Sequence, residues 1–204
     1  MKNPEPNTLN NMVNEEHYTP QDVIDMMFQV RDKYVDFEIT QYLEPSAGDG
    51  RMIEGVDKPF IAYDINPKSD KVIHGDFLTT DISYLKGRLT IMCPPFSLVH
   101  DFVEKTLDIS DYVIAMLPRQ GLTNVINYET THVDCAYMYK EYDFGTTVTT
   151  FFIVGCRRRL IGDGIYQPMN NRDLWVDWLK LNSNKPIKIN HLPPFDPEFV
   201  KIIK

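Results

Sequence analysis

Three apolar runs of this sequence end in residues that could bind a ligand. After the first run comes a segment of mainly small residues, which let the backbone turn tightly and approach a ligand: Glu44, Pro45, Ser46, Ala47, Gly48, Asp49 and Gly50. Twenty residues beyond Glu44, Asp64 ends the run FIAYD, where a carboxylate can accept both hydroxyls of a ribose. Asp76-Phe77 follows the third run and offers a carboxylate and an aromatic ring to a purine. Taken in order, the ends of the three apolar runs predict a tight turn, an acceptor for a ribose and a site for a purine. Each of these acidic residues could also be an ordinary turn residue.

The elements that carry these residues predict an α/β protein. Apolar residues at helical spacing in 97–110 predict a helix between the last two of five strand candidates, and this alternation implies right-handed crossovers and a mostly parallel sheet. Two β-prone runs either side of Phe144-Gly145 predict a closing antiparallel hairpin within 135–159, which brings the sheet to seven strands. The five strand candidates lie within 41–50, 59–64, 71–77, 88–96 and 111–118.

The sequence divides into three parts. Residues 1–16 are rich in Asn, Glu and Pro without a period and predict a mobile arm. Residues 17–159 form the predicted main domain, which begins with an amphipathic helix whose N-cap is Thr19 and whose first helical residue is Pro20. Residues 160–204 predict a basic C-terminal extension packed on that domain.

Composition excludes several classes of protein. The 204 residues are 43% hydrophobic, 25% charged and 12% aromatic, which is typical of an ordinary globular protein. Three widely spaced cysteines without a C-x-x-C pair fit neither a disulfide framework nor a zinc cluster, and no histidine has metal-ligand spacing. We find no membrane span or secretory signal, and expect a cytoplasmic protein without a metal.

Charge is distributed unevenly along the chain. The net charge of −8 argues against binding nucleic acid by bulk electrostatics. Residues 1–156 carry 12 basic and 24 acidic groups, whereas residues 157–204 carry 9 basic and 5 acidic groups. The tail, which begins with Arg157, Arg158 and Arg159, could therefore contact phosphates, although these arginines could also form a solvated strand end.

Four motifs in order resemble a known family. EPSAGDG, AYDINP and GDFL are similar to the first three motifs of class I S-adenosylmethionine-dependent methyltransferases, and Cys93-Pro94-Pro95-Phe96 resembles the (Asn/Asp/Ser)-Pro-Pro-(Tyr/Phe) motif of amino methyltransferases, above all those acting on adenine in DNA. The resemblance covers about residues 17–156 and implies a Rossmann-like, doubly wound fold. It implies cofactor contacts by Tyr18, Thr19, Pro20, Glu44, Pro45, Ser46, Ala47, Gly48, Asp64, Ile65, Asp76 and Phe77.

The resemblance also implies how a target base would be held. The first motif residue and the following proline carbonyl accept hydrogen bonds from the target amino group, while the aromatic ring, here Phe96, stacks on the flipped base. The motif here is Cys93, Pro94, Pro95 and Phe96, and its first residue departs from the family pattern because a thiol is a weak acceptor. Cys93 could instead be a small buried residue that ends a central strand. A nucleophilic role is a third reading, but the order Cys-Pro-Pro differs from the Pro-Cys order of cytosine carbon-5 methyltransferases.

These observations give a leading prediction and two rivals. The leading prediction is methylation of an exocyclic amino group, adenine in DNA first, with the basic tail and the segment 120–131, predicted as loops, reading the target. One rival is a non-catalytic cofactor-binding or interaction module, motivated by Cys93 and by the acidic main body. The other is an amino methyltransferase acting on RNA or on a protein glutamine. A protein partner or a homodimer is compatible with all three.

Overall fold

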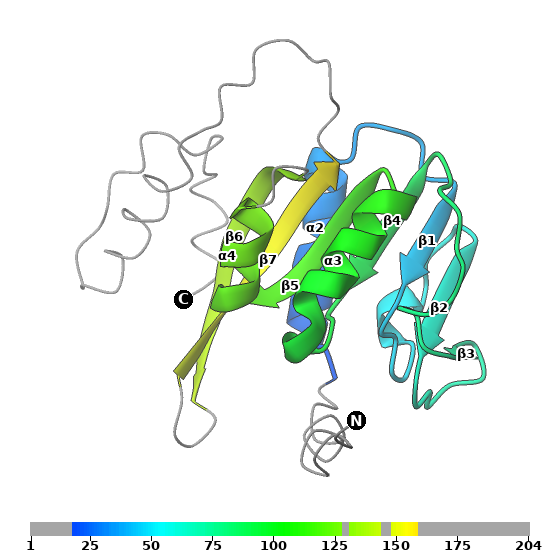
Figure 1. Cartoon of the computed structure of the whole chain (residues 1–204), viewed down its shortest axis with the longest axis horizontal. Helices are drawn as coiled ribbons and strands as arrows, with labels where there is room; N and C mark the ends of the chain where they lie inside the picture. The colour runs from blue at the N-terminus through cyan, green and yellow to red at the C-terminus, as the bar shows by residue number, and fades with distance from the viewer. Residues whose placement is uncertain (1–17, 128–130, 144–147, 159–204) are drawn as a thin grey trace, which may run out of the picture.

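Seven β-strands form one sheet in the computed structural model of this protein (Figure 1). The structure describes residues 18–127, 131–143 and 148–158; the predicted arm at 1–16 and the predicted extension at 160–204 lie outside them. The spatial order of the strands is β3-β2-β1-β4-β5-β7-β6. The strands are β1 (Gln41–Glu44), β2 (Phe60–Asp64), β3 (Ile73–His74), β4 (Arg88–Met92), β5 (Tyr112–Pro118), β6 (Thr131–Asp143) and β7 (Val148–Arg158).

The direction of the strands places the end of each apolar run at one edge of the sheet. Strands β1 to β5 pair in parallel, and β7 pairs antiparallel with both β5 and β6. The chain order reverses where β1 lies beside β4, because β2 and β3 extend the sheet to one side of β1 and β5 extends it beyond β4. Open α/β sheets bind their ligands at such a switch point, outside the carboxyl ends of the strands.

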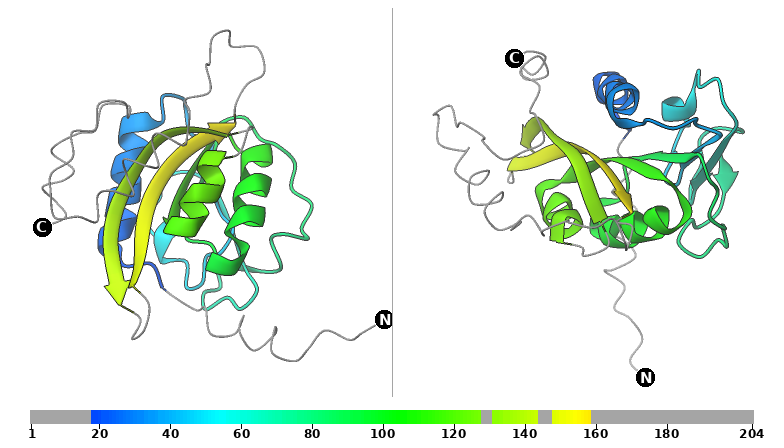
Figure 2. Two further views of the ribbon diagram at one scale, coloured as in Figure 1. Left: turned by 60° about the vertical axis from the view of Figure 1, so that its left-hand side comes forward. Right: turned by 90° about the horizontal axis from the view of Figure 1, so that it is seen from above.

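Helices cover both faces of the sheet (Figure 2). Helix α2 (Gln21–Tyr34) lies on one face, and α3 (Val99–Ile109) and α4 (Arg119–Asn127) lie on the other. Two single turns of 3₁₀-helix, η1 (Arg51–Ile53) and η2 (Phe96–Leu98), follow the glycine-rich segment and the Pro-Pro segment. In the described ranges, no helix has the length and apolar character needed to cross a membrane.

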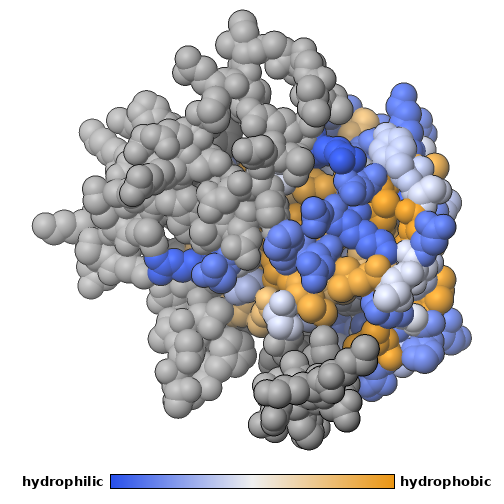
Figure 3. All heavy atoms as spheres, in the orientation of Figure 1, coloured by the Kyte–Doolittle hydropathy of each residue, from blue (hydrophilic) through white to orange (hydrophobic). Residues whose placement is uncertain are grey.

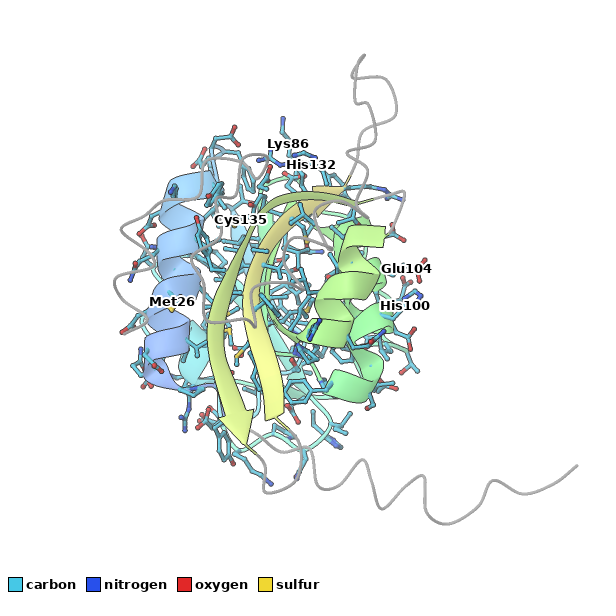
Figure 4. The ribbon with its side chains drawn as sticks, turned by 90° about the vertical axis from the view of Figure 1, so that its left-hand side faces the viewer. Met26, Lys86, His100, Glu104, His132 and Cys135 are labelled. Carbon is cyan, nitrogen blue, oxygen red and sulfur yellow. The ribbon has the colours of Figure 1, made fainter. Side chains whose placement is uncertain are left out.

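Each face of the sheet has its own hydrophobic core. Met26 from α2 and Cys135 from β6, both labelled in Figure 4, are buried in the core under α2. Phe102 from α3 and Phe152 from β7 are buried in the core on the other face. The outer side of α3 is polar, since His100 Nδ1 lies 3.8 Å from Glu104 Oε2 one turn away, and hydrophilic side chains gather over the described part of this face (Figures 3 and 4).

The predicted start of the first helix is wrong by one residue. Its N-cap is Pro20 rather than Thr19, and the helix begins at Gln21. Pro20 has an extended backbone (φ −60°, ψ 151°), and its carbonyl accepts hydrogen bonds from the N–H groups of Val23 and Ile24 at 3.1 and 3.2 Å. The Thr19 side chain instead makes a hydrogen bond with the thiol of Cys93, which directly follows β4.

The prediction of loops at 120–131 is also wrong for most of that segment, because residues 119–127 form α4. Its sequence, RQGLTNVIN, contains few strong helix formers. Leu122 and Val125 are nonetheless buried three residues apart, and a Cβ built at Gly121 would lie 2.8 Å from Val99 of α3. Close packing against α3 and the sheet therefore stabilises a helix that local propensity does not predict.

Candidate functional site

The segments after β1 and β2 are joined through Asp64. The N–H of Gly48 donates to Asp64 Oδ2 at 2.7 Å, and the N–H of Asn66 donates to Oδ1 at 2.7 Å. A further bond runs from the N–H of Ala47 to the Tyr63 carbonyl at 2.9 Å. Gly48 has a φ of +53°, which explains a glycine at this turn. A carboxylate has about four acceptor positions, so Asp64 can still accept the two hydroxyls of a ribose.

Glu44 ends β1 as a buried acid. Its side chain is 2% exposed, and its Oε2 has no hydrogen-bond partner. Burial raises the pKa of Glu44 well above its ordinary value, and the nearby carboxylates of Asp49 and Asp64 raise this pKa further. A buried acceptor without a donor is costly, so Glu44 is suited to a ligand that brings a hydrogen-bond donor or a cation.

The segment before α2 packs onto the glycine-rich turn. A Cβ built at Gly48 would lie 3.7 Å from the Tyr18 ring. The Arg51 guanidinium lies 4.9 Å from the centroid of the same ring. Arg51 is held in turn by Asp49, with 2.6 Å between Nη2 and Oδ2. Sequence reasoning missed Arg51; the only signal was a basic residue placed directly after the turn and two residues after an acid.

The Cys-Pro-Pro-Phe segment lies beside the same turn. Ser46 Oγ donates to the Cys93 carbonyl at 3.1 Å, and Thr19 makes a side-chain hydrogen bond with the Cys93 thiol. Burial raises the pKa of Cys93 to about 11; the bond with Thr19 opposes this shift and the Glu44 carboxylate adds to it. The thiol is therefore neutral at physiological pH, which disfavours a role as nucleophile because the thiolate is the reactive form.

Phe96 is partly exposed and packs on the core under α2. Its ring centroid lies 5.1 Å from that of Phe151 in β7, with the planes tilted by 47°. Pro94 is buried, Pro95 is half-buried, and both peptide bonds are trans, as are all those the structure describes. The segment is thus fixed by the core on one side and by Ser46 on the other.

Comparisons with known proteins identify the fold that carries these segments. No family model matches the sequence, and no curated protein matches it. The chain is similar to the solved structure of the 23S rRNA methyltransferase ErmE, with a TM-score of 0.52 and 13% identity over 71% of this chain and 70% of that one. It is also similar to a Listeria monocytogenes protein assigned to the class I S-adenosylmethionine-dependent methyltransferases, with a TM-score of 0.54 and 11% identity over 76% of this chain and 64% of that one. This chain has the class I methyltransferase fold.

The predicted fold class is therefore confirmed. The mostly parallel, seven-stranded sheet with its antiparallel hairpin of β6 and β7 is the methyltransferase sheet that the sequence motifs imply. Within this fold, the structure brings Tyr18, Thr19, Gly48, Asp64 and Cys93 to one edge of the sheet. Their roles toward a ligand stay predictions.

The segment after β3 of the methyltransferase fold differs from expectation. The Phe77 ring is 1% exposed and lies 5.4 Å from Phe102 and 6.4 Å from Tyr63, centroid to centroid. It fills the core instead of presenting an open face to a purine, because burial of a large ring is strongly favourable. Asp76 is exposed, and its Oδ1 accepts a hydrogen bond from the Leu78 N–H at 2.9 Å. Only the carboxylate of this pair is available to a ligand.

Arg157 and Arg158, at the end of β7, lie away from the carboxyl ends of the parallel strands, where the candidate site is. Because β7 runs antiparallel to β5, its last residues lie near the start of β5. Arg157 Nε donates to Asp134 Oδ2 at 2.8 Å, and Arg158 Nη2 lies 2.8 Å from Asp108 Oδ1. Their contact with a substrate stays a prediction, and Arg159 lies outside the described residues. In the described part of the chain, no group of His, Cys, Asp or Glu side chains could hold a metal ion.

Proposed function

We propose that this protein is an S-adenosylmethionine-dependent methyltransferase that acts on an exocyclic amino group, with adenine in a nucleic acid as the substrate and DNA as its first candidate. The observation that carries the proposal is the bond from Ser46 Oγ to the Cys93 carbonyl. It joins the turn expected to hold the cofactor to the segment expected to hold the target base. Methyl transfer requires that the methyl donor and its acceptor lie side by side, so the segments that hold them must be in contact.

The residues of the site fit the cofactor. S-adenosylmethionine, when bound, supplies an activated methyl group. Asp64 would accept the ribose hydroxyls, and Ile65, whose side chain is 65% exposed beside it, would contact an apolar part of the ligand. The unpartnered Oε2 of Glu44 suits the ammonium group at the methionine end. The proposed contacts are Tyr18, Thr19, Pro20, Glu44, Pro45, Ser46, Ala47, Gly48, Asp64, Ile65 and Asp76; the buried ring of Phe77 supports them from the core.

The target amino group would be oriented by the Pro94 carbonyl, while the partly exposed Phe96 ring would stack on the base. Cys93 stands where a strong acceptor is expected, and its neutral thiol offers only a weak one. Removal of one well-placed hydrogen bond from a transition state costs about 10²-fold in rate. We therefore expect slow transfer by the natural sequence.

The test combines two measurements. Calorimetry gives the affinity for S-adenosylmethionine, and transfer of a labelled methyl group to DNA, RNA and protein gives the substrate class. Both are made on the natural protein and on Cys93→Asn, which restores an acceptor, with Asp64→Asn as the control that should weaken the cofactor site. Label in DNA that increases at least about tenfold in Cys93→Asn supports the proposal.

The other outcomes each favour a different function. Binding without transfer by either protein favours the non-catalytic module, and label in protein favours a glutamine methyltransferase. Absence of binding removes the cofactor from the proposal altogether. RNA is the second candidate substrate, because the similar structure of ErmE is that of a 23S rRNA methyltransferase; label in RNA alone selects it.

A further inference from the structure

Lys105 on α3 holds the segment that follows β3. Its Nζ donates to the carbonyls of Phe77, Leu78 and Thr80 at 2.6, 3.0 and 2.5 Å. An ammonium group has three donors, and these bonds account for all of them. The Nζ also lies 4.8 Å from the centroid of the Phe77 ring, within the range of a cation–π contact.

This segment has little regular structure of its own. Strand β3 ends at His74, and the next strand begins only at Arg88. The local bonds in between centre on Asp76, whose carbonyl accepts from the N–H groups of Thr79 and Thr80 at 3.2 and 3.1 Å. Lys105 fastens the turn so formed to a regular helix, which the local bonds cannot do.

The ammonium group of Lys105 interacts with two carboxylates, and one of them, that of Asp76, belongs to the proposed cofactor site. Lys105 is half-buried, and burial lowers its pKa, while the carboxylates of Asp76 and Asp81 raise that pKa. Both acids therefore lie close enough to the ammonium group to interact with it. Movement of the Lys105 side chain would alter both the position of the Asp76 carboxylate and the electrostatic potential at that carboxylate.

We propose that Lys105 is a positioning residue for recognition of the purine of the cofactor: it fixes the turn at 76–80 so that the Asp76 carboxylate accepts a hydrogen bond from the 6-amino group. This inference rests on the proposed function. A lysine that only stabilised the fold would affect every ligand equally, whereas a positioning lysine affects the choice between an amino and an oxo group at purine position 6.

The experiment compares two ligands, S-adenosylhomocysteine and S-inosylhomocysteine, which carry an amino group and an oxo group at that position. Calorimetry gives the ratio of their affinities for the full chain, and thermal unfolding reports the fold. The variants are Lys105→Met, which removes the three donors, and Lys86→Met, a matched control at an exposed lysine that precedes β4 at the other edge of the sheet (Figure 4).

We expect the natural protein and Lys86→Met to prefer the adenosine ligand by about tenfold or more, and Lys105→Met to lose most of this preference. In an Asp76→Ala background, Lys105→Met should change the ratio no further. If Lys105→Met does not fold, Lys105→Gln, which loses the charge and one of the three donors, takes its place, and a partial loss of the preference is expected.

An unchanged ratio in a folded Lys105 variant overturns the inference while the proposed function stands, and so does an equal loss of affinity for both ligands. Absence of binding of either ligand by the natural protein overturns the proposed function itself. The two failures are thus distinguished by the natural protein alone.

Discussion

Three acids at the edge of the sheet have different environments and therefore different tasks. Glu44 is buried with one oxygen unpartnered, Asp64 is half-buried with an N–H donor on each oxygen, and Asp76 is exposed within a turn. Of the three, only Asp64 has a backbone N–H donor on each carboxylate oxygen while it is still half-exposed to a ligand. At the scale of single residues, the proposed site thus depends most on Asp64.

Asp64→Asn should weaken the binding of S-adenosylmethionine about tenfold or more. The substitution removes the negative charge and replaces one acceptor oxygen with an NH₂ donor, which faces the N–H of Gly48 or Asn66 or a ribose hydroxyl. Calorimetry checks the affinity, and Asp70→Asn, at an exposed residue nearby in sequence, is the control that should leave it unchanged. Equal affinities for the natural protein and Asp64→Asn would remove Asp64 from the cofactor site.

Glu44→Gln should stabilise the ligand-free protein at high pH and not at low pH. Because burial raises the pKa of Glu44 in the folded state, folding favours the protonated acid. The stability that this protonated acid contributes is therefore fully present below the unfolded pKa of 4.5. It is lost as pH rises through the higher pKa of the folded state. Glutamine remains neutral at every pH. At about pH 8 the free energy of unfolding of the variant should therefore exceed that of the natural protein by about 1 kcal/mol or more.

Urea unfolding at about pH 4.5 and about pH 8 measures this difference. Glu54→Gln, at an exposed glutamate, is the matched control and should show no comparable pH dependence. Equal stability of Glu44→Gln and the natural protein at both pH values would contradict the prediction. The same variant should bind S-adenosylmethionine more weakly, since glutamine has no negative charge to pair with the ammonium group of the ligand.

At the scale of elements, the contact between α2 and the hairpin sets the position of the Cys-Pro-Pro-Phe segment. Phe96 rests on Phe151 of β7, and Tyr34 of α2 shares a hydrogen bond of 2.7 Å with Tyr137 of β6. Val30 of α2 lies close to the backbone of β7 at Gly155. The antiparallel hairpin is therefore part of the support of the site as well as the end of the sheet.

Gly155→Ala should destabilise the protein by about 1–3 kcal/mol. A Cβ at Gly155 would lie 2.7 Å from the Tyr112 hydroxyl oxygen and 2.8 Å from Cys135 Sγ, both of them buried. Urea unfolding measures the loss, and Gly75→Ala, whose nearest contact would be an ordinary 3.8 Å, should change stability by less than about 0.5 kcal/mol. Equal effects of the two substitutions would show that β7 can move away from β6.

At the scale of the whole molecule, charge limits the kinds of substrate. The chain has a net charge of −8, and its positive balance lies in residues 157–204. A duplex must therefore be held by local basic groups and not by the field of the entire protein.

Nucleic-acid binding should weaken at least about tenfold as salt increases from about 50 to 200 mM, because each phosphate contact releases counterions. Fluorescence anisotropy with a labelled DNA duplex and an RNA hairpin measures this dependence, and the affinity for S-adenosylmethionine is the control that should change far less. A glutamine-containing peptide should also show a weak dependence. A salt-independent affinity for both nucleic acids would count against them as substrates.

The sequence alone determined the sheet and the residues at its edge. Apolar runs that end in Glu44, Asp64 and Cys93 define strands locally, and strands in parallel must bring their ends together. The α/β class and the residues at the strand ends therefore followed from short-range pattern and order, whereas the roles expected for Tyr18, Thr19 and Cys93 came from the resemblance of the motifs to a known family.

Tertiary structure decided what depends on contacts between distant segments. The sequence does not show that Phe77 turns into the core toward Phe102, or that Lys105 reaches back to three carbonyls of the segment before it. It also does not predict α4, whose apolar residues form a helix only when packed against α3 and the sheet. In each case, the free energy comes from burial or hydrogen bonding between parts of the chain that only the folded state brings together.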